Sequence, residues 1–262
     1  MAKLPPFPGT TGRRDWKTAF DAIGKLMANG DDTTQVFRIM RSLNVGEGAK
    51  NYARLIATET GGQLACEQTE MASLLSDKAY VAQFAPGTVG AAYRHFLEKT
   101  GYSADGLVEV SRINPGEDLR HPYAWFGRRV RDTHDIWHVL TGYKADESLG
   151  EAALVAFSYA QVGGLGWAFI GAAAALKSLQ VTRNTLFARA VWEGYRNGRK
   201  AKWISGEDYQ KLLHEPIDAA RARLGIPTPV AYLKAQRELG AEMASYLSAK
   251  KDAAPAPERL AA

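Results

Sequence analysis

The sequence predicts an all-α protein, folded as a single multi-helix domain with loose termini. Along most of the chain, apolar residues recur at spacings of three and four, as amphipathic helices require. Alternation typical of a strand never extends beyond a few residues, and no repeat recurs at a fixed period. We expect the helical domain to span residues 15–246, between a flexible Pro/Gly-rich N-terminal tail (1–14) and a disordered C-terminal tail (247–262).

Composition excludes several classes of protein. With 46% hydrophobic and 23% charged residues, the chain of 262 residues can bury a core, which excludes wholesale disorder. The net charge of +5 favours an anionic partner surface, either membrane lipid or nucleic acid. Cys66 is the single cysteine, so paired-cysteine zinc motifs are excluded. Residues 1–14 lack the apolar core of a secretory signal, so we expect a cytoplasmic location.

The first half of the chain contains a series of short amphipathic helices. The first is expected from Asp15 to Asn29, with Trp16, Phe20, Ile23 and Met27 on its buried stripe. A second helix is expected after the capping segment 31–34, with the apolar residues of 36–43 inside, and further helices are expected at 50–59, 68–75, from 79 onwards, and at 89–99. Thr88 is suited to cap the last of these, and we expect a loose connection over 101–121.

The second half opens with a helix expected over 124–141, which Gly142 ends. The stretch 152–176 carries no formal charge and is long enough to span a bilayer, but clustered glycines and polar residues favour two buried core helices. Beyond it we expect a basic helix over 182–196, a hinge at Asn197–Gly198, and last helices around 207–224 and 230–247.

The candidate metal ligands lie on and just after the helix expected over 124–141. His134 and His138 are four residues apart, so a helix stacks them on one face, where two imidazoles can hold one metal ion. Asp135 is either a third ligand or the acceptor that orients an imidazole. Glu151 follows a short loop, and a returning helix can bring its carboxylate back to the histidines. The set suits zinc, or iron bound by two histidines and a carboxylate. A bare pair of histidines at this spacing is also common without a metal.

Together these residues resemble the signature of the coenzyme Q (ubiquinone) biosynthesis protein four family. The resemblance covers roughly residues 18–235. The segments that carry it are His134–His138 with Leu149–Glu151, Ala85–Tyr93, Asn197–Arg199 and Ala219–Ile226. One residue more than in the family's pattern separates His138 from Glu151, which we assign to an insertion in the loop 143–149, with Glu147 as the alternative ligand.

The resemblance implies an all-α fold with an apolar, lipid-accommodating core, and a divalent metal, zinc in the family, on His134, Asp135, His138 and Glu151. It implies an enzyme of ubiquinone biosynthesis, a carbon–carbon lyase that decarboxylates ring carbon one of a polyprenylated hydroxy- or methoxybenzoate. If that step is coupled to hydroxylation, iron or a substrate radical is required to activate oxygen, because zinc has no redox chemistry. Implied partners are the prenylated precursor, membrane surface lipids, other enzymes of the pathway and a second copy in a homodimer. The implied location is cytoplasmic, peripheral to the inner membrane.

Two other interpretations stay open. The protein could be a non-catalytic scaffold that binds prenyl lipid and organises the biosynthetic enzymes. It could also be a His-Asp metal phosphohydrolase, whose further ligands would come from His95 or His121 and from Asp208 or Asp218. A basic run over 183–202 is typical of a solvated face, and would also suit anionic head groups or a prenyl phosphate. Because no nucleic-acid-binding signature is present, we expect no nucleic acid partner.

Overall fold

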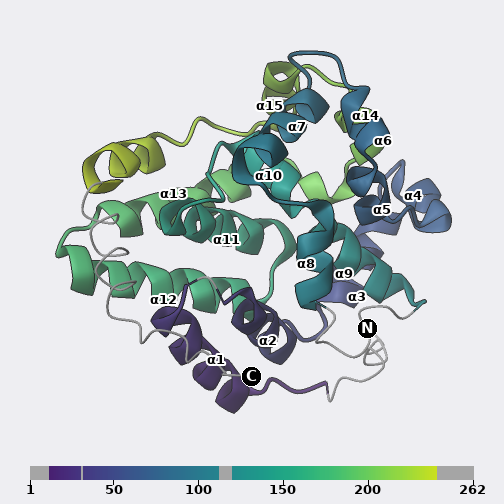
Figure 1. Cartoon of the computed structure of the whole chain (residues 1–262). Coiled ribbons are helices and arrows are strands. Elements are labelled where there is room, and N and C mark those ends of the chain that lie inside the picture. Colours follow the sequence, from purple (N-terminus) through teal and green to yellow (C-terminus); the bar gives the residue numbers. More distant parts are fainter. Residues whose placement is uncertain (1–11, 31, 112–119, 241–262) are drawn as a thin grey trace, which may run out of the picture.

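The computed structural model describes residues 12–30, 32–111 and 120–240, and within these ranges it confirms the all-α prediction (Figure 1). The described residues form helices and no strand, apart from one isolated bridge between Thr88 and Pro216. The predicted C-terminal tail and nearly all of the predicted N-terminal tail lie outside the described ranges.

The helices follow one another through short connections. Their bounds are α1 Trp16–Ala28, α2 Thr33–Leu43, α3 Glu47–Ile56, α4 Gly61–Glu67, α5 Met71–Ser76, α6 Lys78–Ala82, α7 Val89–Thr100, α8 Ala104–Ser111, α9 Pro122–Asp132, α10 His134–Thr141, α11 Ser148–Val162, α12 Leu165–Thr182, α13 Leu186–Lys200, η1 Ile204–Gly206, α14 Tyr209–Leu212 and α15 Ile217–Leu224. Residues 230–240 are helical as well.

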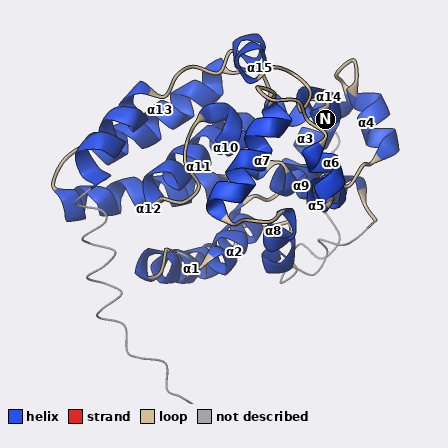
Figure 2. Ribbon diagram, turned by 45° about the horizontal axis from the view of Figure 1, so that its top comes forward, coloured by secondary structure: helices blue, strands red, loops and turns tan. Residues whose placement is uncertain are grey.

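The long helices α11, α12 and α13 lie side by side on one side of the molecule, with α1 and α2 against α12 (Figures 1 and 2). The short helices α3 to α6, with α9 and α14, gather on the opposite side, and α10 lies between the two groups. This arrangement places α10, which carries both histidines, against the start of α11.

Helix α11 is the centre of the long-helix group because it is apolar on nearly all sides. Leu154 and Phe157 are fully buried in it. Close approach of α13 depends on Gly194 and Gly198, where an added Cβ would lie 2.3 Å from the Ala153 carbonyl oxygen and 2.6 Å from that of Phe157. The predicted hinge at 197–198 is therefore wrong, since both residues lie inside α13 and serve its packing.

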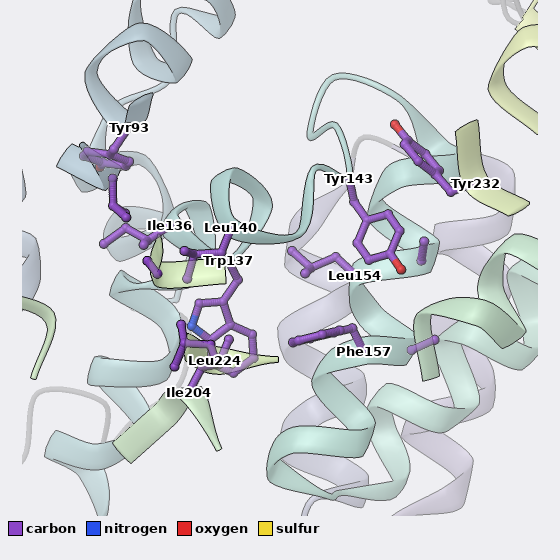
Figure 3. Packing of buried hydrophobic residues seen from close by; sticks show 14 of the residues in the cluster. Tyr93, Ile136, Trp137, Leu140, Tyr143, Leu154, Phe157, Ile204, Leu224 and Tyr232 are labelled. Carbon is purple, nitrogen blue, oxygen red and sulfur yellow. The ribbon is translucent and has the colours of Figure 1, made fainter. Parts of the chain in front are cut away.

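Trp137 anchors α10 in the main core. Its indole and Leu140 point from α10 into the interior that Leu154 and Phe157 enter from α11 (Figure 3). The Trp137 Nε1 donates to the Tyr209 hydroxyl at 2.6 Å, so the polar edge of this buried ring is also satisfied. This packing holds the site-bearing helix against the core along one face.

The buried face of α1 differs from the predicted one. The helix has the expected bounds and Asp15 caps it, accepting from the Thr18 amide at 3.0 Å. However, Trp16 and Phe20 are 44% and 61% exposed, while Ala19 and Ala22 are fully buried. Small alanine side chains let neighbouring helices approach closely, and the large rings then lie at the rim of the contact.

Two connections contain helix that the sequence pattern did not predict. The supposed loose segment 101–121 includes α8, which packs on α5 and α9. Gly61 opens α4, where an added Cβ would collide with the Leu55 carbonyl oxygen at 1.7 Å. Both elements are short, so tertiary packing rather than local periodicity decides whether they form.

The apolar stretch 152–176 forms two helices, as predicted, but only α11 is a buried core helix. Helix α12 buries one side and leaves Leu176 63% exposed. Gly163 and Gly164 separate α11 from α12 with φ values of 72° and 90°, a region of backbone space that favours glycine. Among the described helices, none combines the length and the apolar character that crossing a membrane would require.

Candidate metal centre

The helix that carries the histidines begins at His134 itself. The sequence predicts one helix over 124–141, but the structure has two, α9 and α10, with Thr133 between them at φ −96° and ψ 1°. The Thr133 hydroxyl donates back to the Arg129 carbonyl at 2.8 Å, an interaction that bends helices. The break places both histidines in the two turns of α10.

His134 and His138 share one face of α10, as predicted. Their ring centroids are 4.8 Å apart, and the ring planes are nearly perpendicular, at 79°. His138 is almost fully buried, with 1% of its side chain exposed, and its ring stacks on Phe96 of α7 at 6.1 Å. The His134 side chain is 19% exposed. The pair therefore points inward, with His134 nearer the surface.

A backbone carbonyl determines the tautomer of His138. Its Nδ1 lies 2.8 Å from the Tyr143 carbonyl oxygen, which can only accept, so Nδ1 carries the hydrogen. In the neutral ring the Nε2 atom then presents a lone pair. It is buried and makes no well-aligned hydrogen bond among the described residues, although it lies at ion-pair distance from Glu151. Tyr143 is held in turn by Asn197, whose Nδ2 donates to its hydroxyl at 3.2 Å. The sequence carried no signal for this contact, because its acceptor is a main-chain oxygen.

Glu151 completes a cluster of three donor groups. It lies in the first turn of α11, and its Oε1 is 3.3 Å from the Nε2 of His138. One donor atom from each of His134, His138 and Glu151 lies within 4.8 Å of the others. The Glu151 side chain is 41% exposed, so the cluster opens to the outside on this side.

The loop before α11 brings Glu151 into place and takes Glu147 elsewhere. Gly150 lies so close to the loop that an added Cβ would be 2.0 Å from the Lys144 carbonyl oxygen. Glu147 accepts from the Tyr232 hydroxyl at 2.5 Å and from the Gln236 amide at 3.1 Å. Of the two candidate carboxylates, the structure therefore brings Glu151 to the histidines.

Asp135 lies beside His134 rather than within the cluster of three. Its Oδ1 is 3.5 Å from the Nδ1 of His134, and the residue is buried. A carboxylate in this position favours the tautomer with hydrogen on Nδ1 and leaves the other ring nitrogen free as a ligand.

The electrostatics of the cluster favour a bound cation. Burial by itself raises the pKa of Glu151, but attraction to His138 and His134 more than offsets this effect, so the pKa lies below its usual value. Burial lowers the pKa of His134, yet the hydrogen bond to Asp135 and the charges of Glu151 and Asp135 raise it overall. A carboxylate that stays ionised beside two imidazoles attracts positive charge, whether a proton or a metal ion.

The donor set fits a divalent metal. Two ligands bound at about 2.1 Å in tetrahedral directions lie about 3.4 Å apart, close to the 3.3 Å between His138 Nε2 and Glu151 Oε1. Without a metal, the buried Nε2 meets its polar neighbour only by carrying a proton toward Glu151, and a bound cation would take the place of that proton. Two imidazole nitrogens and one carboxylate oxygen suit zinc and iron equally well.

The further ligands that a phosphohydrolase would need do not join the cluster. His121 caps α9, accepting from the Tyr123 amide at 3.2 Å, and His95 is exposed. Asp208 caps α14, and the side chain of Asp218 is 91% exposed. The geometry therefore gives this alternative no support.

Comparisons with known proteins agree on one family. Residues 49–230 match the family model described as coenzyme Q (ubiquinone) biosynthesis protein Coq4. The mitochondrial ubiquinone biosynthesis protein COQ4 of Scheffersomyces stipitis is 30% identical over 67% of this chain and 53% of its own length. That of Yarrowia lipolytica is 30% identical over 81% of this chain and 76% of its own length. A crystal structure from Nostoc punctiforme PCC 73102 shares the fold, with a TM-score of 0.58 at 18% identity, over 82% of this chain and all of the other.

These comparisons also correct the predicted location. Relatives from Scheffersomyces stipitis, Pyrenophora tritici-repentis and Danio rerio are named mitochondrial proteins, which contradicts a cytoplasmic location at the inner membrane. The prediction depended on the absence of a secretory signal, a test that does not detect amphipathic, Arg-rich transit segments. The chain spans 53–63% of the length of the first relatives that it matches. With most of its length matched by the family model, this chain belongs to the coenzyme Q (ubiquinone) biosynthesis protein Coq4 family.

Proposed function

We propose that this protein catalyses metal-dependent loss of the carboxylate at ring carbon one of a polyprenylated hydroxy- or methoxybenzoate precursor of ubiquinone. Family membership supports the pathway. The observation that supports metal chemistry is the cluster of His134, His138 and Glu151, in which the buried Nε2 of His138 makes no well-aligned hydrogen bond within the described ranges and lies 3.3 Å from Glu151. His134, His138 and Glu151 would hold the metal. Asp135 would either orient the His134 ring or bind the metal as a fourth ligand.

When bound, a divalent metal would supply a Lewis acid that polarises substrate oxygens, or redox chemistry if it is iron. The residues of the chain orient the two histidine ligands. The Tyr143 carbonyl keeps the hydrogen of His138 on Nδ1, so the ligand nitrogen cannot be blocked by tautomerisation. Asp135 has the same role toward His134.

The exposure of the three groups gives the substrate a direction of approach. His138 is closed in by Phe96, whereas the Glu151 side chain is 41% exposed. A benzoate ring would therefore approach from the Glu151 side, with its carboxylate toward the histidines. When carbon dioxide leaves, the electron pair remains on the ring and a proton replaces the carboxylate. If hydroxylation is coupled, one atom of molecular oxygen takes the place of the carboxylate and the other leaves as water, with the phenolic ring oxidised to the quinone level.

We also propose that the partners are those of the pathway: the prenylated precursor, membrane lipids, other ubiquinone enzymes and a second copy of the chain. The support for these partners is the family resemblance alone.

Metal content and turnover together test the proposal. Elemental analysis of purified protein should find near-stoichiometric zinc or iron in the wild type. Aerobic incubation with a prenylated hydroxybenzoate should then release carbon dioxide. His138→Ala should lose both metal and turnover, and Glu151→Gln, a milder change at a half-exposed side chain, should weaken both. His95→Ala is the control, because His95 is exposed and lies outside the cluster.

Two outcomes would count against the proposal. Metal-free wild-type protein that still binds prenyl lipid would favour the scaffold instead. Turnover unchanged in Glu151→Gln would exclude the cluster as the reaction site.

A further inference from the structure

A second candidate site lies at the C-terminal ends of α11 and α13. A half-open cavity of about 260 Å³ is lined by Arg54 of α3, Ala160 and Gln161 of α11, and Gly198, Arg199, Ala201 and Trp203. No lining residue is acidic. From this composition we propose that the cavity binds a small phosphate-class oxyanion, either free phosphate or the head group of a lipid phosphate. The inference does not depend on the proposed decarboxylation.

Two of the acceptors that line the cavity are already in use. Gln161 donates from Nε2 to the Gly198 carbonyl at 2.7 Å and accepts at Oε1 from the Ile204 amide at 2.9 Å. These hydrogen bonds leave neither the Gln161 side chain nor the Gly198 carbonyl to oppose a bound anion.

Two guanidinium groups are left over. Arg54 and Arg199 have no ion-pair partner within the described ranges, and Arg54 lies over the Trp203 ring at 4.3 Å. A guanidinium stacked on a ring keeps the edges of its fork free, in the arrangement that binds phosphate through paired hydrogen bonds.

The indole of Trp203 is held firmly, so it gives Arg54 a fixed support beside the cavity. Trp203 stacks on Phe126 with ring centroids 6.1 Å apart and planes at 14°. Gly206 leaves room for the indole, since an added Cβ would lie 2.6 Å from the ring.

The charge balance favours an anion despite the adjoining helix ends. The C-termini of α11 and α13 each present the equivalent of about half a negative charge. Two guanidiniums outweigh this, because each carries a full positive charge. The cavity is smaller than the roughly 300–1,000 Å³ of typical organic-ligand pockets, so it suits a head group or a free anion rather than a prenylated ring.

Titration with phosphate tests the site, using the full chain in a phosphate-free, low-salt buffer. Calorimetry should show inorganic phosphate binding to the wild type. Arg199→Gln should weaken binding about ten- to a hundredfold, as loss of a hydrogen bond to a charged group predicts. Arg199 is exposed and forms no ion pair within the described ranges, so the variant should fold normally. Trp203→Phe keeps an aromatic ring and removes only a buried N–H, so it should leave binding close to that of the wild type.

Arg196→Gln is the matched control. Arg196 is exposed on the same helix, does not line the cavity, and its loss changes the net charge equally. A parallel titration with phosphatidylcholine vesicles, with and without phosphatidate, separates the two sources. Binding to phosphatidate vesicles alone, weakened by Arg199→Gln, would assign the site to a lipid head group. Equal weakening by Arg196→Gln and Arg199→Gln, or no binding of either probe, would overturn the proposal.

Discussion

Replacing Gly194 by alanine should disturb the fold and the metal centre together. Gly194 lies where α13 crosses α11, and its Cβ would be 2.3 Å from the Ala153 carbonyl oxygen. That is about 1.1 Å short of ordinary van der Waals contact, which begins at 3.4 Å. The neighbouring atoms are backbone, so they cannot rotate away, and the two helices must separate.

The size of the effect follows from this overlap. Overpacking of this kind costs about 1–3 kcal/mol of unfolding free energy. Ala153 is two residues from Glu151, so a shift of α11 also moves the carboxylate away from His138. Metal sites tolerate errors of only about 0.2 Å in ligand distance. We therefore expect metal affinity to fall about ten- to a hundredfold, as for other changes that misplace a ligand.

Gly127→Ala is the matched control, because it makes the same change within a helix. Nothing lies within 4 Å of its added Cβ, so it should stabilise α9 by up to about 1 kcal/mol through helix propensity. Urea denaturation and metal titration of both variants provide the measurements. Equal stability of the two variants would refute the close packing of α11 on α13. Reduced stability of Gly194→Ala with unchanged metal affinity would refute the role of Glu151 as a ligand.

Two further substitutions test the framework around the site. Asp132→Ala should cost about 3–5 kcal/mol of unfolding free energy, because it removes the carboxylate that neutralises Arg131 in a buried pair whose side chains are 1% and 7% exposed, and that also accepts from the Ala72 amide at 3.2 Å. Urea denaturation should show little change for Asp21→Ala, an exposed ion-pair residue, and similar values for the two variants would contradict the reasoning. Tyr232→Phe should cost about 1.5–3 kcal/mol, since its hydroxyl donates to the charged Glu147 at 2.5 Å. A melting temperature equal to that of the wild type would show that this contact does not stabilise the loop.

Features that depend on neighbours along the chain could be predicted from the sequence. The Thr88 cap is one, with the hydroxyl accepting from the Ala91 amide at 3.2 Å, and the left-handed stop at Gly142 is another, with φ 77°. The shared face of His134 and His138 belongs here as well, because helical spacing alone decides it. Each of these rests on contacts within about one helical turn, which residue type and spacing are enough to define.

Features that depend on distant contacts were decided by the tertiary structure. The pattern of α1 favoured its aromatic residues as core, but close packing buries Ala19 and Ala22 and leaves Phe20 61% exposed. Asn197 and Gly198 read locally as a hinge, yet the fold needs a residue without a side chain where α13 crosses α11. In both cases a preference for one conformation or face was overridden by the packing of another helix.

The same division runs through the candidate site. The sequence by itself determined an all-α chain with two histidines on one helix face and a carboxylate nearby, because these follow from residue type and periodicity. Tertiary structure decided that Glu151 rather than Glu147 meets them, and that the Tyr143 carbonyl fixes the tautomer of His138. The packing of separate helices decides which loop carboxylate turns inward and which main-chain oxygen contacts a ring nitrogen. No local pattern in the sequence encodes this packing.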